Sequence, residues 1–407
     1  MSRRALPLIA ASALLAVVLT GCVPNRPGGA GASALTVDAA DTGCTVSSTT
    51  VTAGNVVFTF RNTGTDTNEF EILADDKLRV VGEKENITPG QTITYVVQLQ
   101  PGRYFTACRF RQVGDLVGMA SLKVTGERIR ASSNGSARES KAVADYVSYV
   151  RSQTEQLLPA VTRFADAYRS GDDPAARSLY VTTRAYYERI EPTAEAFGEL
   201  DPGIDYREVD ALAEGRTWRG FHRIEKDLWP PAPGAVNSDG TPADTGWAPS
   251  TPTERAGYAD GLVADVQKLF DLVHGKSFSP GLGEISNGAI GLLDEVATFK
   301  ITGEEDWWSG TDLADFAANL EGAKVAVDNV KEIAASRGSR EATLVRTIDA
   351  RFASLKALLA RYDDPQTGYL PYGQVTQAQR KELSDSVNAL AEPMSRLTSS
   401  VLGVPKS

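Results

Sequence analysis

The stretch ERIRASSNGSARESKAVADYVSYVRSQTEQLLPAVTRFADAY, residues 127–168, marks a change in the hydrophobic pattern of the chain. Its first part, residues 127–139, is polar and rich in small residues, which predicts a linker because such a composition buries little apolar surface. From Ser140 onward the apolar residues recur at helical spacing. The predicted apolar face consists of Val143, Val147, Val150, Thr154, Leu157, Val161, Phe164 and Tyr168. The stretch therefore separates two domains with different secondary structure.

The part before the linker, residues 35–126, alternates with a period of two residues, as half-buried β-strands do. Apolar side chains alternate with polar ones at Val56, Phe58 and Phe60. The same alternation runs from Ile93 to Leu99 and ends before a Pro-Gly turn. Several short strands of this kind, separated by turn residues, predict a small all-β sandwich.

The part after the linker, residues 140–407, keeps the helical period almost to its end. A Pro/Gly/Asp-rich segment, residues 230–252, interrupts it and predicts a long surface loop. The further amphipathic segments are residues 174–197, 253–274, 283–301, 311–337, 340–362 and 377–402. This pattern predicts an all-α helical bundle, so the expected fold class is multidomain, with a β-sandwich followed by a helical domain.

The N-terminus has the features of an export signal. Arg3 and Arg4 precede an apolar run, residues 5–19, that is too short to cross a bilayer. The sequence LTGC that ends at Cys22 resembles the bacterial lipobox, which implies a signal peptide at 1–21 and a lipid on Cys22; an ordinary signal peptide with an incidental cysteine is the alternative. Residues 22–34 then predict a flexible tether. We expect an exported protein, anchored by lipid to the bacterial membrane and facing the periplasm or the cell exterior.

Composition limits the partners and the role of the cysteines. The 407 residues carry a formal net charge of −10, which makes nucleic acid an unsuitable partner because its phosphates would be repelled. Lipidation of Cys22 leaves Cys44 and Cys108 as a pair. Disulfides persist in an exported protein, so a disulfide between these two is one expectation.

The chain contains two histidines, His222 and His274. In GFHRIEK, residues 220–226, His222 and Glu225 are three apart and project from one face of a helix. Such a pair can form part of a metal site with both nitrogen and oxygen ligands, although a surface His–Glu pair has the same spacing. Further carboxylates either join this pair or form solvated faces. They are Glu188, Glu191, Glu195, Glu304, Glu305, Asp306, Asp312 and Asp315.

The stretch 220–226 resembles the GxHxxE motif of the imelysin-like (peptidase M75) domain. The segments YERIEP at 187–192, GEED at 303–306 and TDLADF at 311–316 are similar to that domain in EfeO-type proteins of bacterial iron uptake. Proteins of this family join a cupredoxin-like domain to the imelysin-like domain, in the order predicted above. The resemblance implies a protein that captures Fe³⁺ or Fe²⁺ and passes it to a ferric permease in the membrane, with an exported haem peroxidase as a second partner. The implied iron ligands come from His222, Glu225, Glu188, Glu191, Asp312 and Asp315.

The predicted cupredoxin-like domain departs from the blue-copper pattern, because residues 35–126 contain no histidine. The resemblance offers a different second metal site in its place. Its candidate ligands are Cys44, Cys108, Glu69, Glu71, Glu83 and Glu85. Carboxylates suit iron, whereas free thiolates would suit copper or zinc, and a disulfide would remove the sulfur ligands.

Two other classes of function compete with iron binding. The first is a metal-dependent peptidase, as the M75 name implies, but zinc peptidases of the HExxH type use two imidazoles one helical turn apart and His222 has no such neighbour. The second is a carbohydrate- or peptide-binding module that uses Trp218, Trp229, Trp307 and Trp308. Tryptophans in helical bundles more often belong to the core.

Overall fold

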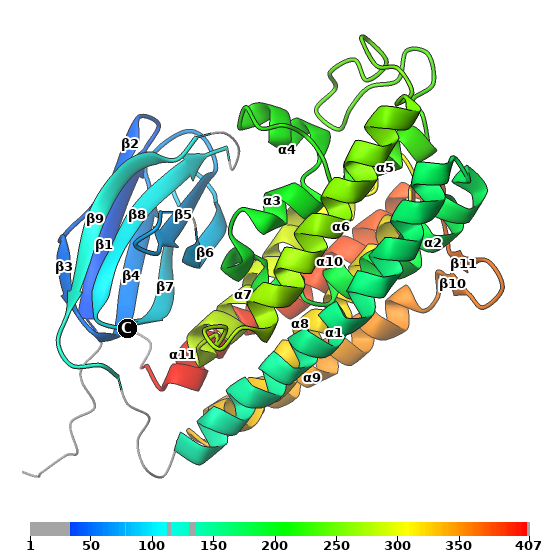
Figure 1. Cartoon of the computed structure of the whole chain (residues 1–407). Helices are drawn as coiled ribbons and strands as arrows, with labels where there is room; N and C mark the ends of the chain where they lie inside the picture. The colour runs from blue at the N-terminus through cyan, green and yellow to red at the C-terminus, as the bar shows by residue number, and fades with distance from the viewer. Residues whose placement is uncertain (1–32, 78, 112–114, 130–135, 405–407) are drawn as a thin grey trace, which may run out of the picture. The chain divides into compact units, whose positions relative to one another are not determined.

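The computed structural model describes residues 33–77, 79–111, 115–129 and 136–404 (Figure 1). The predicted signal peptide, Cys22 and all but the last two residues of the predicted tether lie outside the described residues. The first helix begins at Ser136, inside the stretch expected to be a linker. None of the described helices is both long enough and apolar enough to cross a membrane.

The β-domain consists of two sheets, which confirms the predicted β-class of this half. One sheet has the order β2 (Gly43–Val46), β1 (Ser33–Ala40), β4 (Gly54–Asn62) and β7 (Thr92–Leu99). The other has the order β3 (Thr50–Thr52), β9 (Val117–Thr125), β8 (Gly102–Phe110), β5 (Asn68–Leu73) and β6 (Val80–Ile87). Val56, Phe58 and Phe60 are fully buried between the sheets, as their alternation predicts.

A disulfide joins Cys44 on β2 to Cys108 on β8 and so connects the two sheets. Both residues are buried in the sandwich core. The expectation of a disulfide is therefore met. The two sulfurs are bonded to each other and are not free thiolates, which corrects the hypothesis that Cys44 and Cys108 are metal ligands.

The helical domain occupies residues 136–404 of the described chain. Its long helices are α1 (Ser136–Ser170), α2 (Asp173–Glu188), α6 (Pro252–His274), α7 (Leu282–Thr298), α8 (Asp312–Ala335), α9 (Ser339–Leu359) and α10 (Gln377–Met394). Its short helices are η1 (Glu191–Phe197), α3 (Leu200–Asp205), α4 (Glu208–Ala213), α5 (Phe221–Leu228), η2 (Lys300–Thr302), η3 (Tyr372–Gln374) and α11 (Leu397–Leu402). A small hairpin, β10 (Asp363–Asp364) with β11 (Gly368–Tyr369), lies between α9 and η3.

The boundaries differ from the sequence prediction in two informative places. The expected helix at 174–197 ends at Glu188 and continues as the 3₁₀ segment η1, in which Pro192 has no backbone N–H to extend an α-helix. The expected helix at 377–402 divides into α10 and α11, with Pro393 near the break. The short helices α3, α4 and α5 have too few residues to show a helical period, although the three-residue spacing of His222 and Glu225 does lie on a helix.

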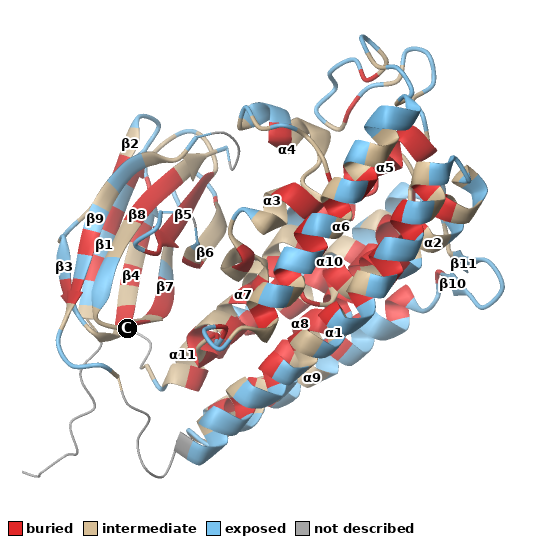
Figure 2. Cartoon of the chain, in the orientation of Figure 1, coloured by how far each residue is buried: buried red, intermediate tan, exposed pale blue. Residues whose placement is uncertain are grey.

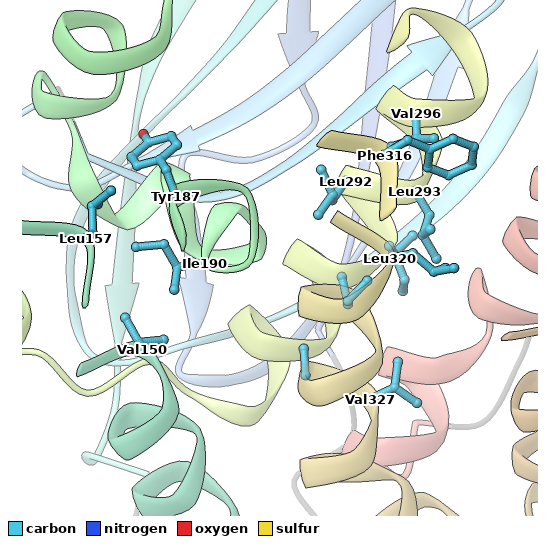
Figure 3. Close-up of a cluster of buried hydrophobic side chains, with 14 of the residues drawn as sticks. Val150, Leu157, Tyr187, Ile190, Leu292, Leu293, Val296, Phe316, Leu320 and Val327 are labelled. Carbon is cyan, nitrogen blue, oxygen red and sulfur yellow. The ribbon is translucent and has the colours of Figure 1, made fainter. Parts of the chain in front are cut away.

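The core of the helical domain is one cluster to which all of its long helices contribute. Figure 3 shows Leu157 of α1 near Tyr187 of α2, Val150 of α1 near Ile190, and Leu292 and Leu293 of α7 near Leu320 of α8. The predicted apolar face of α1 is buried from Val150 to Tyr168, and the outer faces of the helices are exposed (Figure 2). The buried ends of α2, α5 and α8 carry charged residues in place of apolar ones, and these form the site described below.

We predict that removing the disulfide loosens the β-domain. The bond closes a loop with a sequence separation of 64 residues, for which the chain-entropy model gives a stabilisation of about 4 kcal/mol. In the double variant Cys44→Ala/Cys108→Ala, hydrogen exchange of β5 and β8 peptides should accelerate, while α1 and α8 peptides serve as an internal control. Equal exchange of β5 and β8 in the variant and the wild type would contradict the prediction.

Candidate metal centre

The glycine of the GFHRIEK stretch brings two short helices into contact. Gly220 has φ +91°, in the region that favours glycine, and a β-carbon there would collide with the carbonyl oxygen of Ile204. Asp205 follows Ile204 directly at the end of α3. The close approach at Gly220 therefore places the start of α5, with His222, beside the carboxylate of Asp205.

His222 is buried, with one ring nitrogen held and the other left open. Its Nδ1 lies 3.0 Å from Oε2 of Glu225, whereas its Nε2 has no hydrogen-bond partner. Nε2 faces Oδ1 of Asp205 and Oε1 of Glu305, each at 3.5 Å. A buried nitrogen between two carboxylates, without a hydrogen bond, is an atom available to a cation.

Glu225 is fixed by the loop that precedes α8. Its Oε1 accepts hydrogen bonds from the backbone N–H of Trp308 at 3.0 Å and of Ser309 at 2.7 Å, and from the Ser309 hydroxyl at 2.8 Å. Its Oε2 is the partner of His222. Both oxygens of Glu225 are therefore engaged, and the side chain orients the imidazole as carboxylates commonly orient metal-ligating histidines.

Arg184 is the permanent cation of this cluster and is fully buried. Its guanidinium lies 2.5 Å from Glu188 and 2.8 Å from Asp315, and it also contacts Asp205. It lies 3.5 Å from both Glu305 and Asp306. Among the ligands implied by the resemblance, Glu188 and Asp315 thus bind Arg184 in this structure.

The remaining implied ligands also have partners of their own. Asp312 begins α8, and its Oδ1 accepts a hydrogen bond from the backbone N–H of Asp306. Glu191 lies 2.5 Å from Nζ of Lys300. The structure thus gathers all six implied ligands around α2, α5 and α8, with His222 in direct contact with Glu225 and Glu188 beside Glu191.

The pKa shifts of His222, Asp205 and Glu305 indicate which of these side chains carry a proton in the metal-free protein. Burial and Arg184 oppose protonation of the imidazole, but Glu225, Glu305 and Asp205 outweigh them and raise the pKa of His222 to about 10. Burial raises the pKa of Asp205 to about 7, against the attraction of Arg184. Burial also opposes ionisation of Glu305, but Lys300 and His222 hold the pKa of that carboxyl well below its usual range. A proton on His222 therefore supplies positive charge that a metal ion would otherwise bring.

The four glutamates proposed for a second site lie together on one face of β5 and β6. Glu71 is the register partner of Glu83, and Glu69 and Glu85 are their neighbours. Arg109 lies 3.0 Å from Oε1 of Glu71, while Oε2 of Glu71 has no partner. Burial raises the pKa of Glu85 to about 7. Cys108 pairs with Phe70, whose side chain points to the opposite face of the sheet, so the disulfide is separate from these carboxylates.

A cavity of about 350 Å³ connects these two groups of carboxylates. Thirteen acidic and four basic side chains of the described residues line it. Glu69, Glu71, Glu83 and Glu85 contribute from the β-domain, and Asp205 and Glu305 contribute from beside His222. An excess of negative charge in a confined space attracts cations toward the buried cluster.

The second histidine lies outside this cluster, and the tryptophans considered for ligand binding differ in their surroundings. His274 lies at the end of α6, with Nδ1 near the carbonyl of Phe270 and Nε2 near Glu155, and does not join the cluster. Trp218 donates its indole N–H to the carbonyl of Tyr206, and Trp307 is the exposed member of the adjacent pair.

Sequence reasoning missed Asp205, because the short helix α3 carries no motif and reaches His222 only through the contact at Gly220. Glu305 and Asp306 belong to an acidic run that the sequence marked as possible ligands, but they are not among the six ligands that the resemblance implies. Their position depends on the loop between η2 and α8.

Comparison with known proteins places this architecture in a family. Residues 142–397 match the imelysin (peptidase M75) model, and residues 11–117 match the cupredoxin-like domain model. The iron uptake system component EfeO of Escherichia coli O157:H7 is 35% identical over 370 residues, which are 90% of this chain and 91% of that protein. EfeO of Shigella flexneri is 34% identical over the same shares. An imelysin-like protein of Psychrobacter arcticum 273-4 matches 68% of this chain and 98% of its own, at 13% identity and a TM-score of 0.41. The chain therefore belongs to the imelysin (peptidase M75) family, in the EfeO-type arrangement with an N-terminal cupredoxin-like domain.

Proposed function

We propose that this protein binds iron for uptake, with His222, Asp205 and Glu305 as the central ligands. The observation that carries the proposal is the buried, unpartnered Nε2 of His222, 3.5 Å from each of the two carboxylates. Ligand atoms of these three residues lie within 4.8 Å of one another. The relatives' name, iron uptake system component, supports iron as the cargo.

The donor set fits this cargo. Carboxylate oxygens suit hard cations such as Fe³⁺, and an imidazole nitrogen extends the set to Fe²⁺ and Zn²⁺. Glu225 holds His222 through Nδ1, so Nε2 points at the cation. Glu188, Asp312 and Asp315 then support Arg184 and Asp306 instead of binding the metal themselves.

A peptidase would need a free general base beside the metal. Glu225 is the carboxylate of the motif, but three donors hold one of its oxygens and His222 holds the other. This arrangement favours a rigid binding site over hydrolysis.

The further parts of the proposal concern place and partners. A lipid on Cys22 would keep the captured iron near a ferric permease in the membrane, and an exported haem peroxidase would act in the same system. The four glutamates on β5 and β6 are proposed as a second, all-carboxylate cation site. Iron suits such a site better than copper because the cysteines are bonded to each other.

We predict that His222→Ala and Asp205→Asn each lower Fe²⁺ affinity by more than the roughly 10- to 100-fold that loss of an orienting partner costs. Glu225→Gln should fall within that smaller range, because Glu225 orients the imidazole through Nδ1 and is not itself a central ligand of the proposed site. Anaerobic calorimetric titration of the chain without residues 1–22 measures each value. His274→Ala is the matched control and should titrate like the wild type. Unchanged iron affinity in His222→Ala would refute the assignment.

We predict that metal affinity falls as the pH falls. Below its pKa of about 10 His222 is protonated in the metal-free protein, so binding must release that proton. Zn²⁺ affinity should change about 10-fold per pH unit between pH 7 and 8, and more steeply below pH 7 because Asp205 also takes up a proton. Titrations at pH 5.5, 6.5, 7.5 and 8 give the slope. If Zn²⁺ affinity did not change with pH, metal binding would not displace a proton from His222, and the prediction would be wrong.

The lipid anchor is tested separately from the metal site. Cys22→Ala should move the protein from the membrane fraction to the soluble fraction, because the residue that receives the acyl chains is lost. The variant Cys44→Ala/Cys108→Ala should stay in the membrane fraction. Fractionation followed by mass spectrometry of the N-terminal peptide measures both, and an unmodified mature N-terminus in the wild type would contradict the expectation.

A further inference from the structure

A buried lysine lies beside the His222 site in surroundings that resemble those of a bound cation. Lys300 belongs to η2 and is only 4% exposed. Its Nζ lies 2.5 Å from Glu191, 3.4 Å from Glu188, 3.6 Å from Glu305 and 4.0 Å from Glu295. These four carboxylates come from α2, η1, α7 and the loop before α8, so separate parts of the chain converge on one positive charge.

The charge of Lys300 is fixed by these carboxylates. Burial disfavours the ammonium, but Glu191, Glu305 and Glu188 outweigh it and hold the pKa of Lys300 well above its usual range. The lysine ammonium is a compact point charge on a flexible stem, and in this respect it is closer to a metal ion than a guanidinium is. Without it, several buried carboxylates would face one another uncompensated.

A second observation points to a ligand position here. Asn319 of α8 is fully buried, and its Nδ2 donates to Oε2 of Glu188 at 2.8 Å and to the backbone oxygen of the same residue at 3.2 Å. Its Oδ1 has no hydrogen-bond partner. The same Nδ2 also donates to Glu191, so the amide of Asn319 lies against two of the carboxylates that hold Lys300 and carries an unpartnered oxygen. Metal ions such as Mn²⁺ and Fe²⁺ accept both carboxylate and amide oxygens as ligands.

Glu305 connects this cluster to the His222 site. One oxygen of Glu305, Oε1, lies 3.6 Å from Nζ of Lys300 and 3.5 Å from Nε2 of His222. The two positive groups share this carboxylate, so a cation bound at His222 is repelled by the ammonium nearby.

We propose that Lys300 is a tethered cation that fills a second metal position beside the His222 site. Its four carboxylates and Asn319 would bind a divalent ion if the ammonium were absent. In the wild type the lysine limits this region to one exchangeable metal ion and weakens the hold on that ion, which favours release. The inference rests on the proposed function only for the neighbouring ion at His222.

The test is the metal content of Lys300→Met, which removes the charge and keeps an unbranched side chain. Zn²⁺ serves as a redox-inert probe, with stoichiometry from calorimetry and from elemental analysis of the desalted protein. We expect one more Zn²⁺ per chain than in the wild type, and we expect His222→Ala/Lys300→Met to keep that additional ion. Lys331→Met, at a lysine of α8 that pairs with Asp328 and Asp349, is the matched control and should bind like the wild type.

Thermal unfolding covers the case in which the variant is poorly folded without metal. Uncompensated carboxylates should lower the Tm of metal-free Lys300→Met, and Zn²⁺ should raise it by more than it raises the wild-type Tm, because an ion bound to the folded state stabilises it. A variant that takes up no additional Zn²⁺ and gains no additional Tm from it overturns the proposal.

The outcome at Lys300 is separable from that at His222. If the wild type binds no metal and Lys300→Met binds one ion, the proposed function at His222 fails while the inference about Lys300 stands. If the wild type binds one ion at His222 and Lys300→Met binds it with the same stoichiometry and affinity, the inference fails while the proposed function stands.

Discussion

The structure of the helical domain depends on the buried guanidinium of Arg184. Glu188, Glu225 and Asp306 are fully buried, and Asp315 is nearly so, in a region that apolar side chains would fill in an ordinary bundle. Carboxylates so close together repel one another and cannot all ionise without compensation. Arg184 contacts five carboxylates of this region and remains charged at any physiological pH. They are Glu188, Asp205, Glu305, Asp306 and Asp315. Arg184 thereby offsets much of the electrostatic repulsion between the buried carboxylates in the metal-free protein.

This compensation is incomplete on the side of His222. Arg184 contacts Asp205 and Glu305 as well as Glu188, Asp306 and Asp315, but Asp205 and Glu305 also face the open nitrogen of the imidazole. The deficit is met by a proton on His222 in the metal-free protein. At the proposed site, a metal ion that displaced this proton would replace one positive charge with another, so binding and release would need no large rearrangement of the fold.

The β-domain contributes negative charge to the cavity that it shares with the helical domain. Its sheet presents four glutamates to a cavity that also reaches Asp205 and Glu305, and its cysteines are joined in a disulfide. The cupredoxin-like architecture is thus retained without the histidines that a blue-copper centre needs. An acidic cavity of this kind raises the local concentration of cations next to the buried site.

The sequence by itself determined the order of the domains, the class of each and the motif of the site, because periodicity and short motifs are local properties. The two-residue alternation at Val56–Phe60 and the helical face of α1 are both buried as predicted. Residues three apart on one helix must share a face, so His222 and Glu225 were found together. Only the tertiary structure decided which carboxylates reach the open nitrogen. Asp205, Glu305, Arg184 and Lys300 come from separate segments, and their meeting depends on the contact at Gly220, the turn at Pro192 and the loop before α8, none of which has a period or spacing that a sequence displays.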